Sequence, residues 1–164
     1  MTQLRALEPN DIDLLFGIEN DPSLWVVSNT NMPYSRKFLC DYILSTSGDI
    51  YTDKQLRMVI EHDGSPVGLV DLTDFDPKNQ RAELGIIIKK EFRNKGIAFE
   101  AMQLMERYAT DVLHLHQLYA IISETNEPSL RLFAKCSFCN RSTLIDWVIE
   151  GKNHKNALLV QKIL

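Results

Sequence analysis

The first third of the chain combines a short alternating segment with two helical segments and an irregular stretch between them. Residues 2–7 alternate loosely between polar and apolar side chains and predict a first strand. Asp11 is a candidate N-cap for a helix that runs to about Asn20, and Ser35 is one for a second, shorter helix. Residues 20–34 contain two prolines and predict a loop. Irregular segments often carry substrate specificity, so we expect specificity to reside in this loop.

The middle of the chain has the pattern of three strands joined by short turns. The strands are predicted at residues 56–61, 66–75 and 81–89, with turns at residues 63–64 and 76–79. Turns this short join antiparallel neighbours, which makes the three strands a meander. From Leu84 to Ile88 the third strand is apolar at almost every position, so we expect it to be central and covered on both faces.

The last third returns to helical periodicity and then to strands. Residues 97–113 are apolar on one helical face and charged on the other. The strand after this helix follows a crossover and should lie parallel to the third meander strand. It is predicted at residues 118–122, followed by a helix at 128–135 and strands at 140–149 and 155–163. The elements together predict an α+β fold, a mixed and mostly antiparallel sheet of about seven strands with helices on both faces.

Composition restricts the domain organisation and the partners. A chain of 164 residues without a linker or repeat predicts a single domain over residues 1–164. A net charge of -4 and a pI of about 5.5 argue against a nucleic-acid partner. The sequence has no apolar run of membrane-spanning length and no signal-peptide pattern, so we expect no membrane association and a cytoplasmic location. Cys136 and Cys139 have the spacing of half a zinc site, but no second ligand pair is recognisable, so no metal is expected.

The junction between the third meander strand and the following helix is the first candidate site. Gly96 directly precedes this helix, whose first turn offers unpaired N–H groups and the positive end of the helix dipole. Glycine lets the backbone approach phosphate oxygens closely, and Arg93 and Lys95 add positive charge. The Walker and Rossmann patterns are both absent. The junction is therefore a candidate pyrophosphate site, and the alternative is a plain turn in which Gly96 serves geometry alone.

Residues 93–98, Arg-Asn-Lys-Gly-Ile-Ala, resemble the Arg/Gln-x-x-Gly-x-Gly/Ala signature of the GNAT superfamily of N-acetyltransferases. Residues 126–138 resemble the second block of that family, Asn-x-x-Ser/Ala-x-x-x-Tyr-x-Lys-x-Gly-Phe. Residues 144–151 are similar to the last hairpin of the branch that contains ribosomal-protein and polyamine acetyltransferases. Within this branch the chain most resembles the spermidine N-acetyltransferases, in residues 63–71, 81–88 and 118–122.

The resemblance implies an enzyme that transfers an acetyl group from acetyl-CoA to a primary amine by direct attack in a ternary complex. Acetyl-CoA would lie in an opening between the third meander strand and the following parallel strand. The acceptor would be a polyamine, another small amine or a peptide N-terminus, and a homo-oligomer is possible. The residues implied to bind the coenzyme are Ile86, Ile87, Ile88, Arg93, Asn94, Lys95, Gly96, Ile97, Ala98, Phe99, Asn126, Ser129 and Phe133.

The chain departs from the family pattern at Phe133, where a tyrosine often protonates the departing thiolate. Phenylalanine has no proton to give. Either water or another residue then acts as the acid, with Tyr119 and Cys136 as candidates, or catalysis is weaker without it. The alternative is a non-catalytic protein of the same fold that binds acyl-CoA as a sensor or interaction partner.

Glu83 is the first candidate for the catalytic base, and Asp71 is the second. In an ideal strand Glu83 shares a face with Gly85 and Ile87, near the expected thioester. The alternative is that Glu83 is an ordinary solvated or salt-bridged strand residue. The loop run at residues 28–32 has no acidic side chain, so a polyamine would need carboxylates from elsewhere, such as Glu19 and Asp21.

Overall fold

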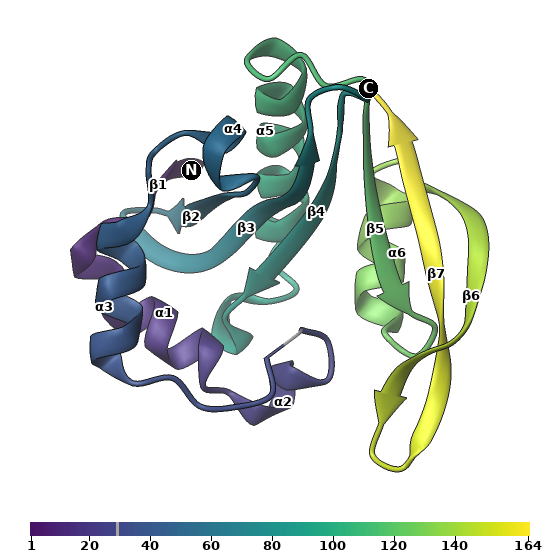
Figure 1. The fold of residues 1–164 in the computed structure, drawn as a ribbon, viewed down its shortest axis with the longest axis horizontal. Coiled ribbons are helices and arrows are strands. Elements are labelled where there is room, and N and C mark those ends of the chain that lie inside the picture. Colours follow the sequence, from purple (N-terminus) through teal and green to yellow (C-terminus); the bar gives the residue numbers. More distant parts are fainter. Residues whose placement is uncertain (29) are drawn as a thin grey trace.

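The computed structural model describes residues 1–28 and 30–164; Asn29, within the loop predicted at residues 20–34, lies outside the described residues. Seven strands of the described chain form one sheet in the order β1-β2-β3-β4-β5-β7-β6 (Figure 1). The neighbouring strands are antiparallel, except that β4 and β5 are parallel. The α+β fold class is thereby confirmed. The strands are β1 (Thr2–Ala6), β2 (Leu56–His62), β3 (Ser65–Asp76), β4 (Arg81–Ile88), β5 (Gln117–Ser123), β6 (Cys139–Glu150) and β7 (Asn153–Ile163).

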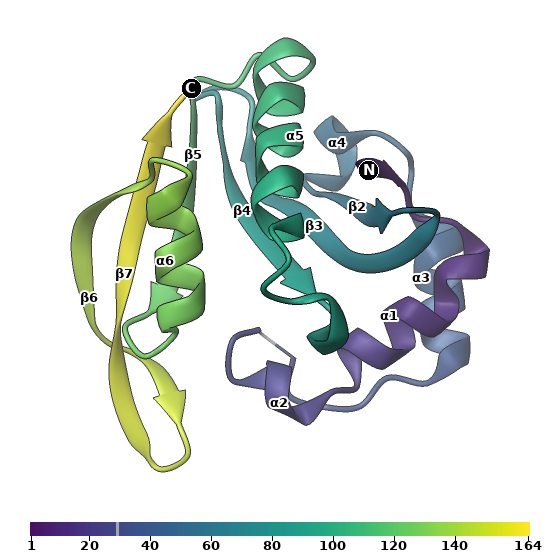
Figure 2. The ribbon, with the colours of Figure 1, turned by 180° about the vertical axis from the view of Figure 1, so that it is seen from behind.

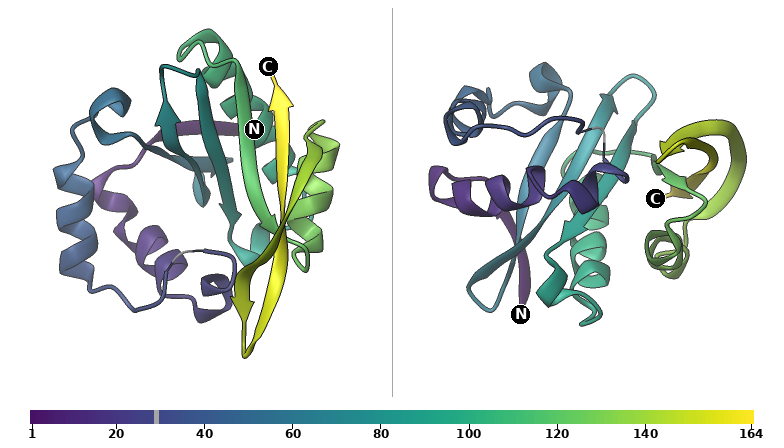
Figure 3. Two further views of the ribbon diagram at one scale, coloured as in Figure 1. Left: turned by 45° about the vertical axis from the view of Figure 1, so that its right-hand side comes forward. Right: turned by 90° about the horizontal axis from the view of Figure 1, so that it is seen from below.

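Helices cover both faces of the sheet. Helices α5 and α6 pack on one face and α1 and α3 on the other, as Figure 2 and the right-hand view of Figure 3 show. The helices are α1 (Ile12–Glu19), α2 (Pro22–Trp25), α3 (Arg36–Ser45), α4 (Ile50–Asp53), α5 (Ile97–Asp111) and α6 (Glu127–Lys135), with 3₁₀ turns η1 (Pro9–Asp11) and η2 (Lys90–Phe92). The central strands therefore lie between two helical layers.

The two faces of the sheet bury separate apolar cores. Successive side chains of a strand point to opposite faces, so Leu69 of β3 packs under α1 and α3 while Val70 packs under α5. The same alternation in β4 sends Leu84 to the α5 core and Ile87 towards the α1 core. The prediction that the third meander strand is central and covered on both faces is confirmed.

Some predicted helix ends need correction. Asp11 does precede α1, but its side chain does not cap that helix. Its carboxylate instead accepts hydrogen bonds from Arg5 Nη1 at 2.7 Å, Arg5 Nη2 at 2.8 Å and the backbone N–H of Glu8 at 2.8 Å. The short helices α2 and α4 were not predicted, and each begins at an aspartate, Asp21 or Asp49, whose side chain accepts a backbone N–H.

The parallel strands β4 and β5 meet at one end and then separate. They pair at Arg81–Gln117, Ala82–Leu118 and Glu83–Tyr119, and no other described residues extend this ladder. Beyond Glu83 the two ribbons diverge (Figure 1). Residues 84–88 of β4 therefore present a strand edge without a β-strand partner on that side, within the described chain.

The outer strand β6 exposes a row of large apolar side chains. Ile145, Trp147 and Ile149 are 70%, 57% and 63% exposed. The pairing of β6 with β7 is interrupted by a bulge between Leu144 and Val148. This bulge carries Ile145 and Trp147 away from the regular ladder.

Candidate active site

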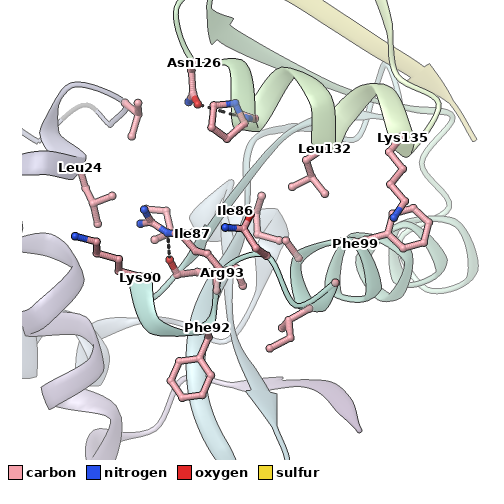
Figure 4. Close-up of a pocket in the computed structure, with 18 of the residues that line it drawn as sticks. Leu24, Ile86, Ile87, Lys90, Phe92, Arg93, Phe99, Asn126, Leu132 and Lys135 are labelled. Atoms are coloured by element: carbon pink, nitrogen blue, oxygen red, sulfur yellow. Dashed lines mark hydrogen bonds between the residues drawn. The ribbon is translucent and has the colours of Figure 1, made fainter.

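A cavity of about 760 Å³ opens where β4 and β5 separate (Figure 4). It is bounded by the end of β4, the turn and first residues of α5, one side of α6 along its length, and α2 on the opposite side. Figure 4 shows Leu24 of α2 facing the cavity from one side and Leu132 of α6 from the other. The predicted coenzyme residues that line it are Ile86, Ile87, Ile88, Arg93, Asn94, Gly96, Ile97, Ala98, Phe99, Asn126 and Ser129.

Two of the predicted coenzyme residues do not line this cavity. Lys95 turns to the ring of Phe92, with its Nζ 5.1 Å from the ring centroid. Phe133 is 2% exposed and packs edge-on against Phe138 at 4.9 Å. Helical geometry explains the second case. Ser129, Leu132 and Lys135 give α6 a cavity side centred on Leu132, and Phe133 lies about 100° further around the helix, in the core.

Several lining residues were missed by the sequence prediction. On α6 the spacing of Leu132 and Lys135 from Ser129 was a usable signal. The residues of α2 had no such signal, because they approach the cavity only through tertiary contacts. The missed lining residues are Ser23, Leu24, Val27, Lys90, Phe92, Pro128, Leu132 and Lys135.

The turn before α5 has the geometry of an anion site. Gly96 is the N-cap of α5 with φ 82° and ψ -10°, and it supplies no side chain to cap the first N–H groups. No atom lies within 4 Å of the point where a Cβ atom of Gly96 would stand, so the space in front of the turn is open. Asn94 also has a positive φ of 60°, which asparagine tolerates. The N–H groups of the first turn of α5 are therefore available to a phosphate.

Positive side chains surround this turn. The Nε of Arg93 donates to the carbonyl of Ile88 at 2.8 Å, which fixes the guanidinium beside the cavity. Lys90 also lines the cavity, and Lys135 extends from α6 with its Nζ 4.4 Å from the ring centroid of Phe99. Three cations, first-turn N–H groups and an unpaired strand edge suit a long ligand that combines phosphates with amide groups.

Glu83 lies where β4 and β5 begin to separate. Its Oε1 accepts the backbone N–H of Ile121, on β5, at 3.4 Å. Burial raises the pKa of Glu83; the hydrogen bond from Ile121 opposes this rise, and the charge of Asp74 adds to it. Among the residues that the structure describes, none forms an ion pair with Glu83. A half-buried carboxylate with a raised pKa and no cationic partner is the form expected of a general base.

Asp71 is held by an arginine. Arg57 donates to both of its carboxylate oxygens, from Nε at 2.9 Å and from Nη2 at 2.8 Å. The remaining Nη1 of Arg57 donates to Glu19 at 2.8 Å. A carboxylate engaged in this two-point contact is poorly placed to accept a proton from a substrate.

The two candidate acids lie in different surroundings. Tyr119 is the register partner of Glu83, and burial together with the charge of Glu83 raises its pKa, so it keeps its proton at neutral pH. Cys136 is buried with its Sγ 3.7 Å from Met102 Sδ, and burial raises the pKa of its thiol to about 11. Neither residue lines the cavity, but Cys136 is enclosed in the core whereas Tyr119 is half-buried and faces Glu83 in the ladder, which makes Tyr119 the better candidate.

The sequence of the chain identifies its protein family. Residues 2–138 match the family model described as acetyltransferase (GNAT) domain. The chain belongs to the GNAT family. GNAT enzymes of this kind are acetyl-CoA-dependent N-acetyltransferases.

Individual relatives of this GNAT chain are polyamine and ribosomal acetyltransferases. It is 29% identical over 161 residues to the spermidine N(1)-acetyltransferase of Escherichia coli K12, covering 95% of this chain and 82% of the relative. It is also 29% identical over 157 residues to the putative ribosomal N-acetyltransferase YdaF of Bacillus subtilis, covering 92% and 85% of the two chains.

Solved structures support the same fold. The spermidine N-acetyltransferase of Vibrio cholerae in complex with CoA and spermine superposes with a TM-score of 0.86 at 23% identity, covering 99% of this chain and 95% of that one. A structure of the Vibrio cholerae enzyme described as dodecameric has a TM-score of 0.82 at 23% identity, covering 99% and 93%. At these identities the likeness establishes the GNAT fold.

Two further features of the GNAT chain concern metals and membranes. The part of the chain that the structure describes contains no group of three or more His, Cys, Asp or Glu side chains that could hold a metal ion. No helix in this described part is long and apolar enough to cross a membrane.

Replacing Gly96 by alanine is expected to weaken CoA binding about tenfold. The new methyl group would fill open space at the N-terminus of α5, where a phosphate of the proposed ligand would approach, whereas the strain of the left-handed φ is common to free and bound protein and lowers stability instead. Titration calorimetry with CoA measures the effect. Gly151→Ala is the matched control, because Gly151 has a φ of 64° in the β6–β7 turn, away from the cavity. Equal CoA affinity in Gly96→Ala and the parent protein would contradict a phosphate site at this turn.

Proposed function

We propose that this GNAT enzyme transfers the acetyl group of acetyl-CoA to a primary amine by direct attack in a ternary complex, with Glu83 as the base. The observation that carries the proposal is the Glu83 carboxylate at the point where β4 and β5 separate. It is half-buried, its pKa is raised by burial, and no described cation neutralises it. An ordinary structural glutamate on a strand would be solvated or paired instead.

The coenzyme is assigned to the cavity between β4 and α6. The edge of β4 at Ile86, Ile87 and Ile88 is suited to the amide groups of the pantetheine arm, since no β-strand of the described chain pairs with that edge. The N–H groups from Asn94 to Phe99 and the side chains of Arg93, Lys90 and Lys135 are suited to its phosphates. Glu83 is three residues from Ile86 on β4, about 10 Å along the strand, so it would meet the acyl end.

Proton transfer falls to two facing residues. Glu83 takes a proton from the attacking ammonium or amine, directly or through one water molecule. Tyr119, opposite Glu83 in the ladder, has a phenol that stays protonated and donates to the departing thiolate. A thiolate is a reasonable leaving group, with an ordinary pKa near 8.5, so this acid need only assist. Tyr119 would thereby take the role that Phe133 cannot perform.

We propose a small cationic amine of the polyamine type as the acceptor. The named relatives include spermidine acetyltransferases. Glu19, Asp71 and Glu83 bring three carboxylates to the α1 side of the sheet, against the single guanidinium of Arg57. A peptide N-terminus is the second candidate acceptor, because the relative named as a putative ribosomal N-acetyltransferase has the same 29% identity to this chain as the spermidine enzyme of Escherichia coli K12. Self-association stays a prediction, for which the exposed row on β6 offers apolar area.

A thiol-release assay with acetyl-CoA tests the proposal. The acceptor panel contains spermidine, spermine, 1,4-diaminobutane, butylamine, an aminoglycoside and an N-terminal peptide. We expect turnover on the diamines and polyamines. Turnover on the peptide alone would move the acceptor to the ribosomal class. Tight CoA binding without turnover on any amine would favour the non-catalytic sensor.

A further inference from the structure

One wall of the cavity is poorly anchored by packing. Ser23 and Leu24 of α2 line the cavity, and so does Val27, two residues after α2. No residue of α2 is buried. Val26 and Val27 are 49% and 50% exposed. Leu24 packs against the core under α1 only as a partly buried side chain, so apolar burial holds this wall in part and polar contacts must add to it.

Polar contacts from the last turn of α1 hold the α2 segment. Glu19 binds it twice: its carbonyl accepts Trp25 Nε1 at 2.9 Å, and its Oε2 accepts the hydroxyl of Thr30 at 3.3 Å. The next residue, Asn20, exchanges two hydrogen bonds with the backbone of Tyr34, at 2.9 and 2.7 Å. Trp25, Thr30 and Tyr34 are thus all hydrogen-bonded to residues at the end of α1.

Glu19 is in turn held by the sheet through Arg57. Its Oε1 accepts a hydrogen bond from Arg57 Nη1 at 2.8 Å, while Nε and Nη2 of the same guanidinium donate to Asp71 of β3. Glu19 and Arg57 are 15% and 25% exposed, so solvent screens this link only in part. A guanidinium with one fixed face has little freedom to turn, and it therefore fixes the orientation of the carboxylate on its other face.

We propose that Arg57 is a positioning residue for the coenzyme: through Glu19 it fixes α2 as one wall of the cavity, although Arg57 itself does not line the cavity. The chain of contacts runs from Asp71 through Arg57 and Glu19 to Trp25 and Thr30. Weakening it loosens the wall and lowers the affinity for coenzyme A, while the groups that transfer protons stay in place. The inference rests on the part of the proposed function that assigns the coenzyme to this cavity, and not on the choice of acceptor.

The test uses tryptophan fluorescence as a direct report of the wall. The chain has two tryptophans, so Trp147→Phe leaves Trp25 as the sole emitter, and Trp147 lies exposed on β6 away from the cavity. In this parent, Glu19→Gln keeps the backbone contact to Trp25 but removes the charge that Arg57 binds. We expect the Kd for CoA to rise about tenfold and the emission of Trp25 to shift to the red.

Arg57→Lys guards against the possibility that a drastic Arg57 variant fails to fold. Lysine keeps the positive charge but cannot make the two-point contact of a guanidinium, so the Kd for CoA should rise in this variant too. The fold increase in Kd for CoA of the double variant should be smaller than the product of the two single fold increases, because both substitutions break the same Arg57–Glu19 contact. Glu61→Gln is the matched control, since Glu61 also pairs with an arginine, Arg5, at 2.8 Å but lies on β2 away from the cavity.

The outcomes separate this inference from the proposed function. A CoA affinity in Glu19→Gln that equals that of Glu61→Gln, or an unchanged Trp25 emission, would overturn the positioning role. A parent that binds CoA but acetylates no amine would defeat the proposed transfer and still allow the role of Arg57 to be judged by Kd and fluorescence. A parent that does not bind CoA would defeat both.

Discussion

Glu83→Gln is expected to lower kcat about a hundredfold, because an amide cannot take the proton of the attacking amine. The Kd for CoA should not change, since Glu83 is not part of the cavity lining. Initial rates at saturating acetyl-CoA, with the acceptor identified by the panel assay, measure the effect. A kcat within about fivefold of the parent would sink the assignment of Glu83 as the base.

The change of kcat/KM with pH tests the same assignment of Glu83 as the base. The base acts as a carboxylate, and burial raises its pKa, so kcat/KM should rise with pH through a limb above the range of an ordinary glutamate. In Glu83→Gln this limb disappears. Asp74→Asn is the matched control, because Asp74 is exposed and its charge helps to raise the pKa of Glu83. Removing that charge should move the limb of the kcat/KM profile to lower pH, and the variant should still turn over.

Stability should change in the opposite direction from activity. A carboxyl group whose pKa is raised by folding binds its proton more tightly in the folded state than in the unfolded state. Its contribution therefore favours folding at low pH and is lost as the pH rises through the raised pKa. At neutral pH Glu83→Gln should consequently have a higher melting temperature than the parent, which calorimetry measures.

Gly68→Ala is expected to lower the free energy of unfolding by about 3 kcal/mol, the upper range for overpacking. A Cβ atom on Gly68 would overlap the carbonyl oxygen of Ile87 and lie 3.0 Å from Ile88 Cδ1. The backbone oxygen cannot move aside without shifting β4. Because Ile87 and Ile88 line the cavity, the same shift should also weaken CoA binding. Urea unfolding and titration calorimetry measure the two effects.

Gly17→Ala is the control for this second prediction. No atom lies within 4 Å of the position of a Cβ at Gly17, which is inside α1 and has no positive φ. Alanine is the better helix former, so the free energy of unfolding should stay the same or rise by about 1 kcal/mol. If both variants unfold at the same urea concentration, the tight approach of β3 to β4 does not limit stability.

The fold was readable because its central elements have strong local patterns. From Leu84 to Ile88, β4 is apolar at almost every position, which is how a strand covered on both faces must appear. The turn at Asp63 and Gly64 has positive φ at both residues, 48° and 76°, as its sequence predicts. Gly96 likewise adopts the left-handed conformation that makes glycine useful at an anion site.

The parts of the site that sequence reasoning missed depend on tertiary contacts. α2 has four residues and no periodicity, and its place beside the cavity depends on Arg57, which is 38 residues from Glu19. Phe133 was assigned to the coenzyme by its motif position, but the helical register of α6 turns it into the core. Motif position identifies the segment, whereas the direction of each side chain follows from the packing of the helix.

The separation of β4 and β5 gives the sheet two edges in its interior. Exposed strand edges at the rim of a sheet invite pairing with other chains and are a common route to aggregation. Here the edge of β4 from 84 to 88 faces a cleft walled by α2 and α6, where a strand of another protein with side chains on both faces would have to pass between two helices. A thin, unbranched molecule with amide groups can enter where such a strand cannot. The site proposed for the coenzyme thereby offers a ligand the hydrogen-bonding groups of a strand edge and keeps those groups away from other polypeptides.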